Sequence, residues 1–234
     1  MTRKDKIRFL VLRTIGNFLV LFAIFGVLAT FGPALYFEAT YQVMKIRGVH
    51  YSVVNQVAET KRTLEAQESK HTSLGFTDVL SGPKEQILAP IDTVFSILIP
   101  KIGANARIFP NINPSKSDVF LPVLKEGVAH AQGTLFPGQP GNIYLFAHST
   151  DNFWDVGRYN AIFYLLKDLK EGDDVIIFYQ NARHNYKVTK IGAISPQEVS
   201  FITHAQTGKE LLILQTCWPP GTTWQRLLVF AEPL

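Results

Sequence analysis

The chain has 234 residues, of which 47% are hydrophobic and 18% are charged, a composition that supports a hydrophobic core of ordinary size. Its single cysteine excludes an intrachain disulfide. Of 23 basic and 19 acidic side chains, five basic and one acidic lie in residues 1–13, so this tail accounts for the whole net charge of +4. The rest of the chain is balanced in charge and gives no reason to expect a nucleic-acid partner.

An uncharged apolar stretch follows the basic tail. Residues 14–37 carry no charged side chain, and a helix over most of them spans about 33 Å, enough to cross a hydrocarbon core of roughly 30 Å. A cleaved signal peptide has a shorter apolar region and an A-x-A-like cleavage site, and no such site lies next to this stretch. We therefore expect an uncleaved, single-pass membrane anchor at residues 14–37. The basic residues before it predict a cytoplasmic tail at residues 1–13 and an extracytoplasmic location for everything after Glu38.

Residues 38–90 are polar and mixed in charge. Apolar residues recur with weak helical spacing from Val43 to Val57, and glycines and prolines punctuate the second half. We expect a juxtamembrane helix followed by a linker that holds the rest of the chain away from the bilayer.

Residues 91–234 have the pattern of a β domain. Short apolar runs recur between clusters of turn residues, and one segment, residues 161–169, has apolar residues at helical spacing instead. Many short strands at this spacing favour a barrel or a sandwich over a parallel α/β sheet. The predicted strands are residues 93–100, 143–147, 174–179, 186–194, 211–215 and 224–231.

The only cysteine follows the fifth of these strands. Two prolines in residues 218–222 cannot continue a strand ladder, so we expect a loop directly after Cys217. The next strand carries Arg226, nine residues after the cysteine, and antiparallel pairing around the loop places its guanidinium near the thiol. A permanent cation favours the thiolate and stabilises an oxyanion, so the pair indicates a nucleophilic site rather than an inert buried cysteine.

Among the six histidines, His148 fits such a site. It follows the apolar run of residues 143–147 and so lies at a strand end, as Cys217 does, although the two are 69 residues apart. We interpret His130 as a residue that supports packing or hydrogen bonding. No metal-ligand spacing, phosphate-binding loop or serine-hydrolase elbow occurs, so we expect neither a metal nor another cofactor.

The order of strand, cysteine, loop, strand and arginine resembles the sortase family, in which T-L-x-T-C precedes an arginine on the next strand. Here the motif reads I-L-Q-T-C at residues 213–217 with Arg226, and its continuation through residues 218–222 is most similar to class D and class E sortases. The resemblance covers about residues 91–234. Further family landmarks agree in order, namely residues 99–103, G-V-A-H at 127–130, G-T at 133–134, G-N at 141–142, and Ala147-His148-Ser149 with alanine in place of the usual glycine.

The resemblance implies both a fold and an activity. The fold is mainly β, a closed barrel with short helices at residues 91–234, preceded by one transmembrane helix. The activity is that of a membrane-anchored cysteine transpeptidase, in which Cys217 forms a thioester, His148 transfers protons and Arg226 stabilises the oxyanion. Thr216 is a candidate for a supporting hydrogen bond. The substrate would be a Leu-Pro-x-Thr-Gly-like sorting signal on a secreted or membrane-tethered protein, and the acceptor an amine on the cell wall or on a pilin.

Two other functions remain open at this point. A non-catalytic, membrane-anchored β-barrel that binds peptides would tolerate replacement of Cys217, and the joint presence of Cys217, His148 and Arg226 argues against it. A cysteine peptidase would hydrolyse the thioester instead of transferring it. The sequence does not separate this peptidase from a transpeptidase, because the difference depends on the access of water to the thioester.

Overall fold

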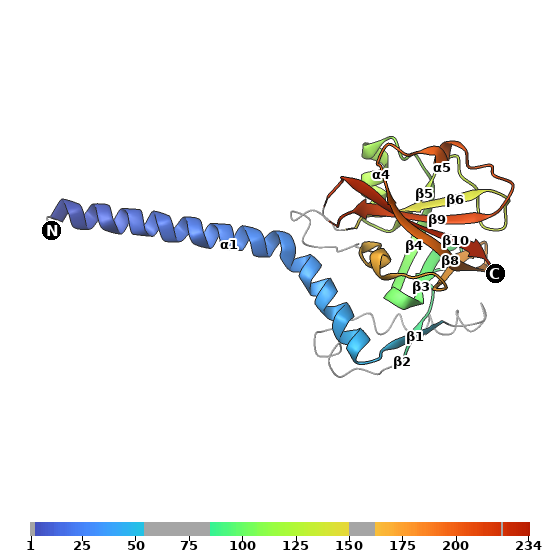
Figure 1. The fold of residues 1–234 in the computed structure, drawn as a ribbon, viewed down its shortest axis with the longest axis horizontal. Coiled ribbons are helices and arrows are strands. Elements are labelled where there is room, and N and C mark those ends of the chain that lie inside the picture. Colours follow the sequence, from blue (N-terminus) through green and yellow to red (C-terminus); the bar gives the residue numbers. More distant parts are fainter. Residues whose placement is uncertain (1–2, 54–84, 150–161, 221) are drawn as a thin grey trace.

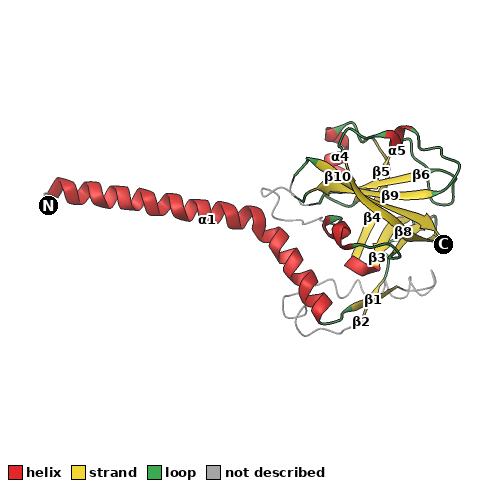
Figure 2. Cartoon of the chain, viewed as in Figure 1, coloured by secondary structure: helices red, strands yellow, loops and turns green. Residues whose placement is uncertain are grey.

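The computed structural model describes residues 3–53, 85–149, 162–220 and 222–234. These residues form a long N-terminal helix, α1 (Arg3–Ile46), that projects from a β-barrel (Figure 1, Figure 2). The segment Arg3–Leu28 is apolar and long enough to cross a bilayer, and the rest of the described chain does not bury it. The apolar N-terminal helix that the sequence predicts is therefore present.

α1 continues past the predicted anchor without interruption. The ribbon of α1 bends along its length (Figure 1). The helix ends before Gly48, whose φ of 68° is left-handed. The amide of Gly48 donates to the carbonyl of Lys45, and that of Val49 to the carbonyl of Met44, which is the Schellman arrangement.

A short strand pair follows the helix. β1 (His50–Val53) pairs in parallel with β2 (Glu85–Leu88), and Val53 lies opposite Leu88. The helical spacing predicted from Val43 to Val57 is therefore wrong at Val53, which belongs to a strand. The Schellman turn is the reason, because it stops the helix before this residue. Val54, Val57 and residues 54–84, which make up most of the predicted linker, lie outside the described residues.

Within the described residues, eight strands close into a barrel in the order β10-β8-β7-β3-β4-β5-β6-β9. Most neighbours pair antiparallel, whereas β4 pairs with β5 and β6 with β9 in parallel. This mainly β, closed barrel with short helices confirms the predicted fold class. The strands are β3 (Phe95–Ile99), β4 (Ala104–Ile112), β5 (Val128–Ala131), β6 (Asn142–Phe146), β7 (Asp174–Tyr179), β8 (Ala182–Ile194), β9 (Leu211–Trp218) and β10 (Gln225–Pro233).

All six predicted strands are present, with ends that differ by a few residues, and β4 and β5 are strands that the sequence did not predict. β9 continues through Cys217 to Trp218, so the cysteine lies inside the strand and the loop begins later than predicted. The helix predicted over residues 161–169 is the 3-10 helix η2 (Tyr164–Asp168), and residue 161 lies outside the described residues. A second 3-10 helix, η1 (Pro100–Ile102), follows β3.

Apolar side chains pack on both faces of the barrel wall, because successive residues of a strand point to opposite faces. On the inside, Leu145 of β6 and Leu214 of β9 belong to the main core. On the outside, Tyr144, Phe146 and Ile213 of the same two strands form a second cluster. Two helices contribute apolar side chains to this outer cluster, namely α4 (Ser117–Leu124) and α5 (Ser200–Thr203).

Candidate active site

The parallel pairing of β6 and β9 brings two predicted site residues together. Each residue of β6 pairs with the residue 69 positions later in β9, from Asn142 with Leu211 to Phe146 with Gln215. The contact continues beyond β6, because the amide of Ala147 donates to the carbonyl of Gln215 at 3.2 Å. One further step in the same register would set His148 beside Cys217, and both residues line the same cavity. Both residues therefore lie at the same rim of the barrel.

The antiparallel pairing of β9 and β10 adds the third predicted residue. Arg226 lies directly opposite Cys217 in this ladder. Residues that face each other in an antiparallel pair project from the same side of the sheet. The guanidinium is oriented by its own turn, since Nη1 donates to the carbonyl of Thr223 at 3.3 Å and to that of Gln225 at 3.2 Å. Cys217 thus lies between His148, which follows the end of β6, and Arg226 on β10.

The side chain of Thr216 does not face the cavity side of the strand on which Cys217 lies. It neighbours Cys217 in the strand and therefore points to the opposite face, into the barrel, where only 2% of it is exposed. Its Oγ1 donates to the carbonyl of Ala147 at 3.1 Å. This hydrogen bond ties the end of β9 to the end of β6, one residue away from both Cys217 and His148.

A cavity of about 570 Å³, lined by both apolar and polar side chains, opens on the outer face beside these residues. Its floor is formed by β6, β9 and β10, and its walls come from α4, α5 and the segments around them. A cavity of this size accepts a stretch of peptide, and its apolar walls suit apolar side chains. The residues that line it include His148, Cys217, Arg226, Tyr144, Phe146, Ser149, Gln215, Phe120, Leu124, Val199 and Ile202.

A model of the sortase domain matches residues 97–234, the part of the chain that carries the barrel and this cavity. The chain belongs to the sortase family. Sortase D of Bacillus subtilis (strain 168) is 28% identical over 137 residues, which are 57% of this chain and 60% of that protein, so the match spans less than two thirds of this relative. This similarity agrees with the class D and class E character of the motif around Cys217.

Solved structures show the same sortase fold. Sortase C-1 from Actinomyces oris is 25% identical with a TM-score of 0.51, and the match covers 76% of this chain and 99% of that one. Sortase A from Corynebacterium diphtheriae is 21% identical with a TM-score of 0.50, and the match covers 76% of this chain and 82% of that one. The second likeness concerns the fold alone.

His130, in contrast, belongs to the packing of the sortase barrel. It is fully buried, accepts a hydrogen bond on Nδ1 from the amide of Asn111 at 3.3 Å, and donates from Nε2 to the carbonyl of Leu135 at 2.9 Å. Its ring stacks on Phe136 with 4.4 Å between centroids. Burial lowers the pKa of His130, although the hydrogen bond to Leu135 acts in the other direction, so the ring stays neutral near pH 7.

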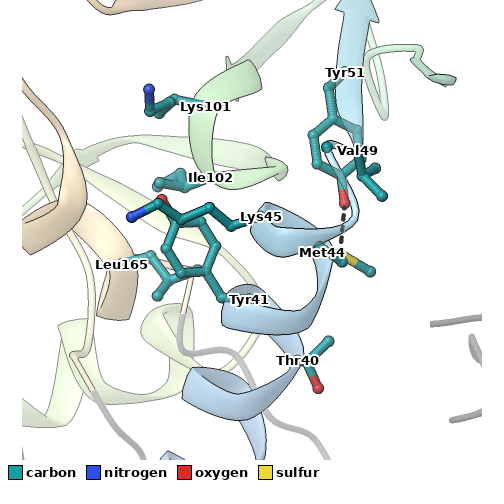
Figure 3. A pocket seen from close by; sticks show the side chains of 10 residues that line it. Thr40, Tyr41, Met44, Lys45, Val49, Tyr51, Lys101, Ile102 and Leu165 are labelled. Atoms are coloured by element: carbon teal, nitrogen blue, oxygen red, sulfur yellow. Dashed lines mark hydrogen bonds between the residues drawn. The ribbon is translucent and has the colours of Figure 1, made fainter. Parts of the chain in front are cut away.

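A second cavity, of about 300 Å³, lies where α1 meets the sortase barrel (Figure 3). Tyr41 of α1, Ile102 of η1 and Leu165 of η2 line it, and the hydroxyl of Tyr51 donates to the sulfur of Met44 at 3.3 Å. No cysteine, histidine or carboxylate lines this cavity, so the groups of a cysteine-dependent reaction are assembled only around the larger one among the described residues. Among the residues that the structure describes, no three or more potential metal ligands lie close enough together to hold a metal ion.

An ion pair fastens α1 beside the second cavity. Lys167 of η2 approaches Glu38 of α1 with 2.6 Å between Nζ and Oε2, and Gln42 donates to the other carboxylate oxygen at 2.8 Å. The hydrogen bond from Lys167 and then that from Gln42 hold the pKa of Glu38 below its usual value. The helix and the sortase barrel are therefore joined by a specific polar contact as well as by packing.

The sequence did not single out two polar residues of the larger cavity, Tyr144 and Gln215. A signal was present, because both lie an even number of residues before His148 and Cys217 and so share their faces of β6 and β9. Tyr144 reads as one more apolar residue of a buried strand, however, and nothing local indicates that a cavity opens above it.

Proposed function

We propose that this chain is a membrane-anchored cysteine transpeptidase that acts outside the cytoplasmic membrane. Membership of the sortase family supports the reaction class. The observation that carries the residue assignment is the position of Cys217, flanked by His148 across β6 and by Arg226 across β10 at the mouth of a peptide-sized cavity. The apolar N-terminal helix supports the anchor.

The proposed reaction has two steps. The thiolate of Cys217 attacks a backbone carbonyl of the sorting signal, the scissile C–N bond breaks, and His148 gives a proton to the leaving amine. An incoming amine then loses a proton to His148 and attacks the thioester, which forms a new amide and restores the thiolate. Arg226 stabilises the oxyanion of both tetrahedral intermediates with directed N–H donors, which a lysine does not supply in the same geometry.

The substrate we propose is a Leu-Pro-x-Thr-Gly-like sorting signal on a secreted or membrane-tethered protein, with an amine of the cell wall or of a pilin as acceptor. The apolar walls of the cavity support a peptide with apolar side chains before the scissile bond. Trp218 and two prolines directly follow Cys217, and this bulky, stiff segment limits the access of water to a thioester. This feature favours transfer over hydrolysis.

Mass spectrometry of the full chain in detergent with a sorting peptide tests the reaction. With peptide alone, an adduct on Cys217 should accumulate, and an added amine should discharge it into a ligated product. Cys217→Ala should form no adduct, and His148→Ala should lower turnover by about 10²–10⁴-fold. Rapid release of free acid, unaffected by amines, would identify a peptidase, and the absence of any adduct would favour a peptide-binding barrel.

Protease treatment of intact cells tests the orientation. With the basic tail inside, external protease should remove the part of the chain after Glu38 and leave the tail protected. Recovery of an N-terminally cleaved protein in the medium would overturn the anchor.

A further inference from the structure

The floor of the larger cavity carries a polar pair that the proposed reaction does not use. The hydroxyl of Tyr144 on β6 donates to Oε1 of Gln215 on β9 at 2.8 Å. Only 2% of Tyr144 is exposed, and burial raises the pKa of its phenol even though the charge of Arg226 acts to lower it. The phenol therefore keeps its proton at physiological pH and remains a donor.

This hydrogen bond orients the carboxamide of Gln215. Because Tyr144 occupies the amide oxygen, the two N–H groups of Nε2 remain as donors beside the cavity. Within the described residues, no acceptor is hydrogen-bonded to this nitrogen. A donor that no acceptor of the described residues occupies, in a cavity with apolar side chains in its walls, has the chemistry to receive a carbonyl oxygen of a bound peptide.

The spacing along β9 indicates which carbonyl this is. Gln215 precedes Cys217 by two residues and shares its face, so the two side chains start about 7 Å apart along the strand. In an extended peptide, carbonyl groups two residues apart also point to the same side and repeat at about 7 Å. When one carbonyl lies over Cys217, the carbonyl two residues away lies over Gln215.

The shape of the cavity indicates the direction of the peptide. Along β9 from Cys217 and past Gln215, Ile213 packs in the outer cluster with Phe120 and Leu124 of α4 and Ile202 of α5, and these three residues also line the cavity. The acyl part of the peptide has to stay bound while the leaving amine departs, so it needs this longer apolar surface. The leaving amine then lies on the side of Thr222 and Thr223, which also line the cavity.

We propose that Gln215, held by Tyr144, hydrogen-bonds the backbone carbonyl two residues before the scissile bond and thereby sets which peptide bond lies over Cys217. The proposal rests on the proposed function. It makes Gln215 a substrate-positioning residue and Tyr144 a residue that acts through it. In a Leu-Pro-x-Thr-Gly-like signal cut after threonine, the carbonyl is that of the proline.

A double-mutant cycle, which combines an enzyme variant with a substrate variant, tests this contact in the full chain. One peptide carries an (E)-alkene in place of the proline–x amide, which removes the proposed acceptor, and a control peptide carries the alkene one residue closer to the scissile bond. For the wild type, loss of the proline carbonyl should lower kcat/KM of acylation by about tenfold, the value of one hydrogen bond. For Gln215→Leu, kcat/KM should already be about tenfold lower with the natural peptide, and the proline–x alkene should cost nothing further.

Additional readouts separate positioning from a structural effect. Gln215→Leu should also give adducts cut at neighbouring bonds, and Tyr144→Phe should show the same loss of register to a smaller extent. Gln132→Leu makes the same substitution at an exposed position outside the cavity and should leave kcat/KM unchanged. If Gln215→Leu does not fold, Gln215→Glu carries the comparison, because a carboxylate still accepts from Tyr144 but has no N–H donor.

The outcomes distinguish this proposal from the proposed function. If the wild type forms no adduct with any sorting peptide, the transpeptidase assignment fails and this inference fails with it. If the wild type forms the adduct and the proline–x alkene lowers kcat/KM of Gln215→Leu by the same factor as that of the wild type, only the contact between Gln215 and the carbonyl is overturned.

Discussion

The hydrogen bond between Thr216 and Ala147 offers a sharp test of how the site is held together. Thr216→Val keeps the shape of the side chain but removes the hydroxyl, which leaves the buried carbonyl of Ala147 without this donor. An unsatisfied buried acceptor costs about 1–3 kcal/mol. We expect the free energy of unfolding to fall by about 2 kcal/mol, and the Tm by about 4–8 °C for a protein of this size.

The same substitution should slow acylation. Thr216 and Ala147 each lie one residue from a proposed reacting group, so their hydrogen bond fixes the ends of β6 and β9 relative to each other. Small displacements of reacting groups cost up to about 10²-fold in rate, and we expect a loss of about 10–10²-fold in Cys217 adduct formation. Chemical denaturation and time-resolved mass spectrometry measure the two effects.

Thr216→Ser is the matched control for this prediction. It keeps the hydroxyl and loses one methyl group, which costs about 1 kcal/mol, and it should acylate at close to the wild-type rate. If Thr216→Val retained both wild-type stability and wild-type acylation, the hydrogen bond would have no part in holding the site, and our account of how β6 and β9 are joined would be wrong.

Three further outcomes are expected. Arg226→Lys should lower acylation by about 10²–10³-fold, and near-full activity would leave Arg226 only a structural role. Gly141→Ala should lower the free energy of unfolding, measured by chemical denaturation, more than Gly172→Ala does. Both glycines have positive φ, but only at Gly141 would the new Cβ lie 2.6 Å from a backbone oxygen. Equal losses of stability in the two variants would contradict this. Burial lowers the pKa of His130 in the folded state, so the contribution of this residue to the free energy of unfolding is complete above about pH 6.5 and is lost as the pH falls toward the pKa of the folded state. His130→Gln should flatten this dependence of the free energy of unfolding on pH.

Local sequence predicts the strands that are buried on both faces. β6 and β7 are continuous apolar runs, and their residues are buried along nearly the whole length. β4 was missed because Asn105, Arg107 and Pro110 interrupt it, and its inward residues near the start are small alanines. Its strand character depends on pairing with β3 and β5, which no local pattern reports.

The same distinction between local pattern and long-range contact applies to the candidate site. Cys217 and Arg226 are joined by a short connection, so their approach follows from local turn chemistry. The position of His148 depends on the parallel pairing of β6 and β9, a contact between distant segments that spacing alone does not specify. The cavity above Tyr144 depends on where α4 and α5 pack, and this is why Tyr144 and Gln215 were missed.

The ion pair between Glu38 and Lys167 has a consequence for where the enzyme can reach. Glu38 is the first charged residue after the apolar stretch of residues 14–37, so the ion pair contacts the barrel close to the point where the chain leaves the predicted bilayer segment. With the membrane anchor proposed above, such an enzyme would search a thin layer at the membrane surface and would meet its partners by lateral diffusion. Effective concentration depends on tether length, so a sorting signal of the proposed kind that stands close to its own membrane anchor would encounter the cavity far more often than the same signal on a freely diffusing protein.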